Sequence, residues 1–160
     1  MELWDAYDEH FQKIEGISLR RGEPVPEGMF HIVSEVLVRH TDGTFLLMKR
    51  APEKHFGGMW EATAGGSALQ GETPLDCALR ELREETGIVA TELEELQLLR
   101  INKRRQFFAD FLCVTDCDKD SVTLQAGETV DCRWVTKEEL LAMPEGELLP
   151  PSVLYYILTM

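Results

Sequence analysis

Hydrophobic and polar residues alternate along several short segments, which is the two-residue period of β-strands. This alternation over residues 3–7 and 14–19, with polar residues between them, predicts an N-terminal β-hairpin. Residues 21–28 contain two prolines and two glycines, so they are predicted to connect elements instead of forming one. Residues 1–28 are therefore expected to form a hairpin followed by a connection.

Two stronger strand patterns follow, at residues 30–38 and 45–49, with Asp42-Gly43 as the turn between them. We expect these two strands to pair antiparallel. Further strands are predicted by the same pattern at 96–101, 107–114, 122–125 and 132–135. Two short helices are predicted near the end of the chain, at 137–142 and 152–158.

One segment has the period of an amphipathic helix that begins after Thr73-Pro74 and ends at Gly87. Its apolar face consists of residues at i, i+3, i+4, i+7 and i+11: Leu75, Ala78, Leu79, Leu82 and Thr86. We expect Leu75, Leu79 and Leu82 to be buried against a sheet. Strands interleaved with few helices predict an α/β fold, with a mixed sheet and helices packed on its faces.

The same helix carries Glu81, Glu84 and Glu85 at i, i+3 and i+4, so their side chains share an arc of about 100°. Like charges at this spacing cost a helix a few tenths of a kcal/mol per pair, unless a cation lies nearby. Clustered carboxylates suit Mg²⁺ or Mn²⁺, which in turn bind phosphates. The preceding Gly65-Gly66 allows the backbone to approach a ligand closely. An isolated E-x-x-E-E triplet, however, is more often a solvated helix face.

The composition narrows the classes of partner. The chain has 160 residues, 44% of them hydrophobic, which is enough for one domain over residues 1–160. Its 29 acidic and 16 basic residues give a net charge of -13, which argues against a nucleic acid polymer or an anionic membrane as partner. A small phosphorylated molecule bound together with a metal ion is still compatible with that charge.

The cysteines and the N-terminus bear on the compartment. The four cysteines form no C-x-x-C pair, and a chain of this size does not need disulfides, which fits a reducing compartment. The first residues lack an export signal, and no apolar run approaches the roughly eighteen residues that span a bilayer. A cytoplasmic protein is therefore expected.

The full spacing around the carboxylates is more specific than the triplet. Gly66 is followed after five residues by Glu72, and after seven more by the run from Arg80 to Ile88, RELREETGI. This resembles the Nudix box, G-x5-E-x7-R-E-U-x-E-E-x-G-U with U a bulky aliphatic residue, at every specified position. Seven fixed letters at roughly one in fifteen each match by chance about once in a hundred million positions. The chain is thus identified as resembling the Nudix hydrolase family.

The resemblance implies a three-layer α/β/α sandwich, a divalent metal, and hydrolysis of a diphosphate linkage in a small nucleoside diphosphate joined to another group. It implies metal ligation by Glu81, Glu84, Glu85 and the carbonyl of Gly65. Arg80 would orient one of the carboxylates. In the box, Gly66, Glu72 and Gly87 would have structural roles, with Glu72 bracing the loop.

The sequence leaves the general base open, because members of the family use either a helix glutamate or an acidic residue from a later loop. Glu81 and Glu128 are the two candidates, although Glu128 is also readily explained as an exposed loop residue. Lys49 and Arg50 are candidates for binding substrate phosphate, and solvated charges at a strand end explain them equally well.

Two other functions are compatible with parts of the pattern. The N-terminal hairpin followed by Arg20-Arg21-Gly22-Glu23, and the Gly57-Gly58-Met59-Trp60 segment, also resemble the isopentenyl diphosphate isomerase branch of this fold. The cysteine that this branch places after the tryptophan is missing here. A non-catalytic module that senses a nucleotide is the other alternative. The apolar tail at 153–160 is expected in the core, and a homodimer interface is the alternative.

Overall fold

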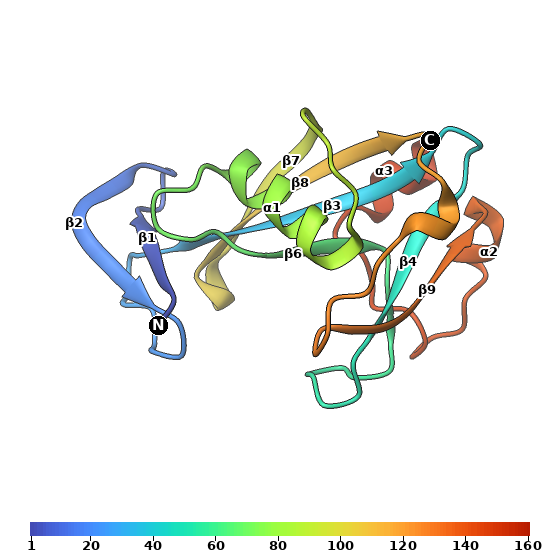
Figure 1. Ribbon diagram of the computed structural model, residues 1–160. Coiled ribbons are helices and arrows are strands. Elements are labelled where there is room, and N and C mark those ends of the chain that lie inside the picture. The colour runs from blue at the N-terminus through green and yellow to red at the C-terminus, as the bar shows by residue number, and fades with distance from the viewer.

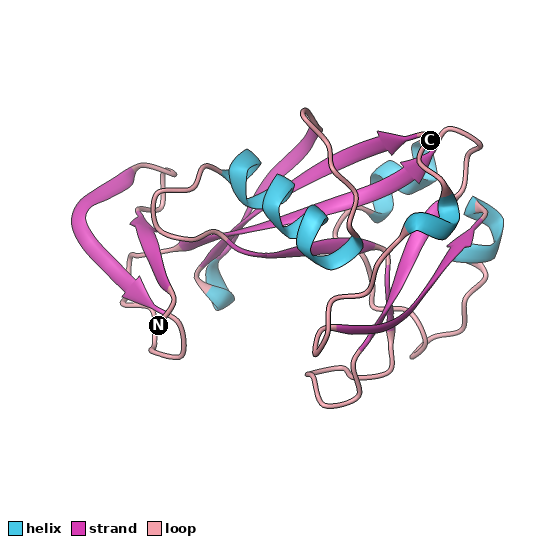
Figure 2. Cartoon of the chain, in the orientation of Figure 1, coloured by secondary structure: helices cyan, strands magenta, loops and turns pink.

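Nine strands and three α-helices follow one another along the chain in the computed structural model, which describes residues 1–160 (Figures 1 and 2). The strands are β1 (Leu3–Tyr7), β2 (Lys13–Arg20), β3 (His31–His40), β4 (Phe45–Arg50), β5 (Trp60–Glu61), β6 (Thr63–Ser67), β7 (Glu94–Ile101), β8 (Gln106–Thr115) and β9 (Thr129–Val135). The α-helices are α1 (Pro74–Thr86), α2 (Lys137–Leu141) and α3 (Leu154–Thr159), and two 3₁₀ turns lie at Asn102–Arg104 and Lys119–Ser121. No helix is both long and apolar enough to cross a bilayer.

Seven strands form one mixed sheet in the order β5-β4-β3-β8-β7, with β6 also paired to β3 and β9 to β4. β3 and β8 run parallel over ten residue pairs, and the other pairings are antiparallel. The predicted antiparallel pairing of β3 with β4 is confirmed, but it is limited to Arg39 and Phe45 beside the turn. β4 and β9 therefore diverge from β3 and β8, as Figure 1 shows.

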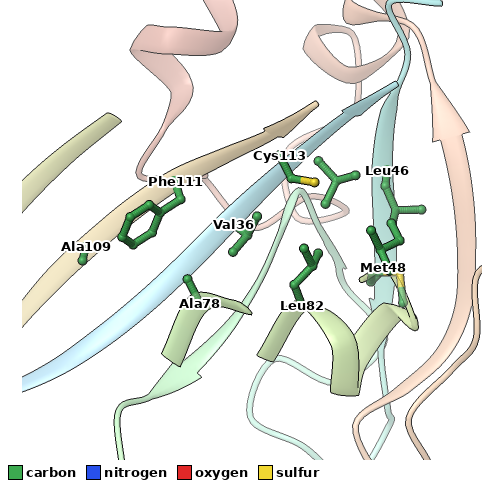
Figure 3. Close-up of a cluster of buried hydrophobic side chains, with 10 residues drawn as sticks. Val36, Leu46, Met48, Ala78, Leu82, Ala109, Phe111 and Cys113 are labelled. Carbon is green, nitrogen blue, oxygen red and sulfur yellow. The ribbon is translucent and has the colours of Figure 1, made fainter. Parts of the chain in front are cut away.

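Hydrophobic side chains fill both faces of this sheet. Val36 and Val38 of β3 belong to a buried cluster that includes Ala78 and Leu82 of α1 (Figure 3). Leu37, between them, points to the other face, where a second cluster includes residues of α2 and α3. Strand side chains alternate between faces, so one strand serves both clusters. Helices therefore cover both faces, and the predicted α/β fold with a mixed sheet is confirmed.

Local signals set the ends of α1. The Thr73 hydroxyl accepts a hydrogen bond from the Asp76 N–H, and the Asp76 carboxylate accepts one from the Thr73 N–H, which forms a capping box. Gly87 adopts the left-handed conformation, with φ of 78°, and ends the helix as predicted. The expectation that Leu75 is buried was wrong, since it is 38% exposed. Cys77, in the same turn, is fully buried against Ile32 and Phe107, and Leu75 is two positions away, on the opposite side of the helix.

The N-terminal hairpin forms as predicted, as a separate two-stranded sheet of β1 and β2. It packs against the loop that precedes α1. The Gln70 N–H donates to the Leu3 carbonyl at 2.9 Å, and the Gly71 N–H donates to the Asp5 carboxylate at 2.8 Å. The Trp4 ring stacks on His31 with 4.0 Å between ring centroids. The hairpin is thus tied to both the loop and the sheet.

Other predicted elements need correction. Residues 122–125 were predicted to form a strand, but they pair with no other strand. The Thr123 N–H instead donates a hydrogen bond to the Thr86 carbonyl at the end of α1. β5 and β6 were not predicted, because β5 has only two residues and β6 contains the Gly65-Gly66 pair and lacks clear alternation. The C-terminal segment at 153–160 was expected in the core, and only one face of it is buried there. Val153 and Ile157 are fully buried, whereas Tyr155 is 69% exposed.

Candidate active site

The three box glutamates of α1 line one cavity, whereas Leu82 of the same helix is fully buried in the core. Their exposure differs. The Glu81 side chain is 13% exposed and the Glu84 side chain is 40% exposed. Glu85 is half-buried. The helix therefore presents one open carboxylate and two that are partly enclosed by neighbouring segments.

Arg80 links this carboxylate face to the preceding loop. Its Nε and Nη2 donate to the two oxygens of Glu72 at 2.6 and 3.0 Å, and its Nη1 donates to Glu81 at 2.9 Å and Glu84 at 3.2 Å. Nη2 also donates to the Ser67 carbonyl at 3.2 Å. A guanidinium has five N–H donors, and these five contacts account for all of them. Arg80 therefore contacts two of the box carboxylates, and the role that the resemblance implied for it, orienting one of them, stays a prediction.

Glu72 holds the loop from the other side. Besides its two bonds from Arg80, it accepts the Leu69 N–H at 2.8 Å. The loop is thereby attached both to the helix and to its own backbone. The bracing role that the resemblance implied for Glu72 stays a prediction, and these contacts are what it would rest on.

Gly65 and Gly66 allow the backbone to pass directly over the carboxylates. A Cβ added to Gly66 would lie 2.4 Å from Glu81 Oε1, and one on Gly65 would lie 2.2 Å from the Ser34 carbonyl. The Gly65 N–H donates to Glu85 Oε2 at 3.3 Å. No larger residue fits at either position without displacing the backbone or a carboxylate.

Glu85 is a carboxylate without a cationic hydrogen-bond partner. Its carboxylate accepts one hydrogen bond, from the Gly65 N–H, and burial together with the nearby charges of Glu81 and Glu61 raises its pKa to about 8. Lys54 opposes this shift only weakly. A buried carboxylate in this state is stabilised by a bound cation, which is consistent with the metal-ligand role predicted for Glu85.

Three adjoining cavities meet at this site. One of about 310 Å³ is lined by Glu81, Glu84 and Glu85, and one of about 120 Å³ shares Glu85, Gly65 and Gly66 with it. A larger cleft of about 860 Å³ shares Glu35, Arg50, Glu61 and Thr63 with the smallest cavity. The carboxylate face therefore opens through the small cavity into a cleft large enough for a small-molecule ligand.

Apolar side chains from separate elements line much of the large cleft: Phe56, Ala62, Leu99, Ile101, Phe108 and Leu149. Arg104, from the basic segment at the β7–β8 connection, also lines it. The loops at 51–59 and 102–106 both contribute residues to this cleft.

Two acidic residues of the site were missed in the sequence, Glu35 and Glu61. Glu35 lies beside Gly65 in the β3–β6 pairing and beside Asp110 in the β3–β8 pairing. Burial, and then the charge of Asp110, raises the pKa of Glu35 to about 7. A charged residue within the largely apolar run from Ile32 to Val38 was the available signal, because charged residues are rarely buried without a partner.

The two base candidates occupy different surroundings. Glu81 accepts a hydrogen bond from Arg80, and Glu128 forms an ion pair with Lys54. Glu128 lies in a loop and lines both smaller cavities, so its position is compatible with a role in the site. The choice between the two bases stays a prediction.

Of the two predicted phosphate-binding residues, Arg50 lines the site and Lys49 does not. Arg50 lines the small cavity and the large cleft, and its Nη1 donates to Glu61 at 2.5 Å. Lys49 lines none of the three cavities; its Nζ lies 5.7 Å from the centroid of the Trp60 ring. Neighbouring residues of a strand point to opposite faces, so Lys49 is not brought to the site with Arg50.

No group of three or more acidic, histidine or cysteine side chains converges closely enough to hold a metal ion in this arrangement. Glu81 and Glu84 instead direct oxygens at Arg80. The donor set itself, carboxylate oxygens beside a glycine backbone, suits a hard divalent cation.

Comparison with known proteins agrees with this geometry. A family model described as NUDIX domain matches residues 29–154. An uncharacterized Nudix hydrolase of Listeria monocytogenes is 36% identical over 153 residues, which cover 94% of this chain and 89% of that protein. One from Listeria innocua is 35% identical over 156 residues, covering 94% and 89%.

Solved structures show the same fold. The crystal structure of DR0079 from Deinococcus radiodurans matches with a TM-score of 0.75 at 21% identity, over 99% of this chain and 98% of that one. The NUDIX domain of Shewanella oneidensis NrtR, crystallised with ADP ribose, matches with a TM-score of 0.58 at 19% identity, over 72% and 78%. From the matched domain and these relatives, the chain belongs to the Nudix hydrolase family.

Proposed function

We propose that this protein hydrolyses the diphosphate linkage of a small nucleoside diphosphate joined to another group, with Mg²⁺ or Mn²⁺ as cofactor. The observation that carries the proposal is the packing of Gly65 and Gly66 against Glu81 and Glu85, where the two smaller cavities adjoin. Family membership supports hydrolysis of a phosphoanhydride bond in general, and Nudix hydrolases typically use divalent metals.

The metal would be held by Glu81, Glu84, Glu85 and the carbonyl of Gly65. When bound, it would neutralise phosphate charge and lower the pKa of a water molecule. Glu85 fits this role because its carboxylate is enclosed and has no cationic hydrogen-bond partner. Glu81 and Glu84 would have to share their oxygens between Arg80 and the metal.

The protein's own groups would position the reactants. Arg80 and Glu72 hold the loop and the helix face in register, and Arg50 is placed where a phosphate would pass from the small cavity into the large cleft. An arginine can bind phosphate through two N–H groups at once. Glu81 or Glu128 would accept the proton of the attacking water.

The other part of the substrate would occupy the large cleft. Its apolar side chains, Phe56, Leu99 and Phe108 among them, suit a flat or apolar group, and Arg104 adds a cation at its edge. A nucleoside fits such a mixture, because its base is flat and its sugar is polar.

The isomerase alternative is not favoured by the structure. No cysteine lines any of the three cavities. The cysteine nearest to the glycine loop, Cys77, is fully buried, with its Sγ 3.4 Å from the Gly66 carbonyl oxygen. Burial raises the pKa of its thiol to about 12, which leaves it protonated and unreactive.

The test is a panel assay with Mg²⁺. Nucleoside diphosphate sugars, ADP-ribose, dinucleoside polyphosphates, nucleoside triphosphates and isoprenoid diphosphates would be supplied, and released phosphate or nucleotide measured with and without EDTA. We expect metal-dependent turnover of at least one nucleotide. Glu138→Gln, an exposed glutamate on α2, serves as the matched control for loss of activity in Glu85→Gln.

Three outcomes would contradict the proposal. Tight binding of a nucleotide with no turnover of any compound would indicate a sensor. Double-bond migration without phosphate release would indicate an isomerase. Equal turnover by wild type and Glu85→Gln would remove the helix carboxylates from the mechanism.

A further inference from the structure

The cavity beside α1 extends to the N-terminal hairpin. Glu2 and Arg21 line it together with Arg80, Glu81 and Glu84. Both hairpin residues lie outside residues 29–154, the part of the chain that the NUDIX family model matches. The hairpin, which lies to the left of α1 in Figure 1, therefore adds its own residues to one end of the site.

Arg21 is held at a fixed position by the hairpin. Its N–H donates to the Glu2 carbonyl at 3.1 Å, directly after the pairing of Leu3 with Arg20. Its Nη1 donates to Glu2 Oε2 at 3.1 Å, while the other Glu2 oxygen accepts the Trp4 Nε1–H at 2.8 Å. Glu2 is thus fixed from two sides and directs the guanidinium.

The three cations of this cavity differ in the number of donors that are free. All five N–H donors of Arg80 are used within the protein. Lys54 forms an ion pair with Glu128. Arg21 makes one side-chain contact, to Glu2, and its side chain is 68% exposed. Most of its donors therefore remain available to a ligand.

The other charges in the cavity are negative. Five carboxylates line it, those of Glu2, Glu81, Glu84, Glu85 and Glu128. An anionic substrate would be repelled by them, except where a metal or a free cation faces it. Arg21 is the side chain that supplies such a cation at the hairpin end.

We propose that Arg21 binds an anionic group of the substrate, most simply a phosphate beyond the linkage that is cleaved. Its fork of N–H donors matches phosphate oxygens in a bidentate way. The substrate would then span the site, with its apolar part in the large cleft, its scissile diphosphate at the box glutamates and a further phosphate at Arg21. This proposal rests on the proposed function and assigns a specificity role to the hairpin.

The test compares Arg21→Gln and Arg21→Lys with Arg20→Gln. Arg20 is the matched control, since it is the adjacent exposed arginine, contacts only the Met1 sulfur and lines none of the three cavities. With the best nucleotide of the panel, we expect Arg21→Gln to raise KM about tenfold with kcat within about twofold, because one charge-assisted contact is lost. Arg21→Lys should recover part of the affinity, and Arg20→Gln should match wild type.

A second readout does not depend on turnover. Calorimetry would measure the binding of inorganic triphosphate in the presence of Mg²⁺, and thermal melting would establish that all four proteins are folded. We expect an affinity about tenfold weaker for Arg21→Gln than for Arg20→Gln. Equal triphosphate affinities, or equal KM values, for these two variants would overturn the assignment of Arg21. Absence of turnover in wild type would instead contradict the proposed function, and calorimetry would still decide the role of Arg21.

Discussion

Replacing Glu85 by glutamine should stabilise the protein when no metal is present. The wild-type carboxylate is enclosed, accepts only a long hydrogen bond of 3.3 Å from the Gly65 N–H, and has other carboxylates nearby. A neutral amide of nearly the same shape removes the charge without opening a cavity. The residue proposed to hold a metal is therefore predicted to be unfavourable for folding in the metal-free protein.

The size of this effect follows from the pKa. Burial raises the pKa of Glu85 from 4.5 to about 8, and each pKa unit corresponds to about 1.4 kcal/mol, so the fully charged carboxylate costs at most about 5 kcal/mol. At pH 8 about half of these carboxyls are protonated in the folded protein, which lowers this upper limit to about 4 kcal/mol. Lys54 and water entering the cavity offset part of this cost, which leaves about 2 kcal/mol. For a protein of this size, that corresponds to a rise in Tm of about 4–8 °C.

The assay is thermal melting at pH 8 in EDTA, followed by titration with Mg²⁺. Glu84→Gln is the matched control on the same helix: its side chain is 40% exposed and paired with Arg80, so its loss should lower stability by no more than about 0.5 kcal/mol. Added Mg²⁺ should raise the Tm of wild type and leave that of Glu85→Gln nearly unchanged. A Glu85→Gln protein that melts at or below wild type in EDTA would refute the reasoning.

Two more predictions concern stability. Arg80→Ala should lower the free energy of unfolding by about 3 kcal/mol, because three carboxylates lose a partly buried partner. The control, Arg83→Ala, removes an exposed arginine of the same helix and should lower it by less than about 1 kcal/mol. Similar urea midpoints for the two variants would contradict this prediction. Burial lowers the pKa of His31 to about 4, so its contribution is complete above its unfolded value of 6.5 and decreases as the pH falls from 6.5 toward 4. Wild type should therefore lose about 2 kcal/mol more than His31→Phe between pH 7 and pH 5, and equal losses in urea denaturation would argue against a buried neutral histidine.

The site was predictable where its residues are close in sequence. Glu81, Glu84 and Glu85 share a helix face through spacing alone, and the capping residues at Thr73 and Gly87 set that helix in its correct range. Such features depend on 3.6 residues per turn and on local hydrogen bonds, which the sequence encodes directly.

The rest of the site depends on strand register. Glu35 meets Gly65 and Asp110 only because β3 pairs with β6 on one side and with β8 on the other. A shift of one residue would turn its side chain to the opposite face. The exclusion of Lys49 and the inclusion of Arg50 follow from the same alternation on β4.

The sequence by itself determined the family pattern, the glutamate-bearing helix and the layered α/β architecture, because these are written in local spacing and periodicity. Tertiary structure alone decided that Glu35 and Glu61 join the site, and that Arg21 of the hairpin reaches the cavity lined by the helix glutamates. These facts concern residues far apart in the chain. Their proximity is set by packing and pairing, which no local pattern specifies.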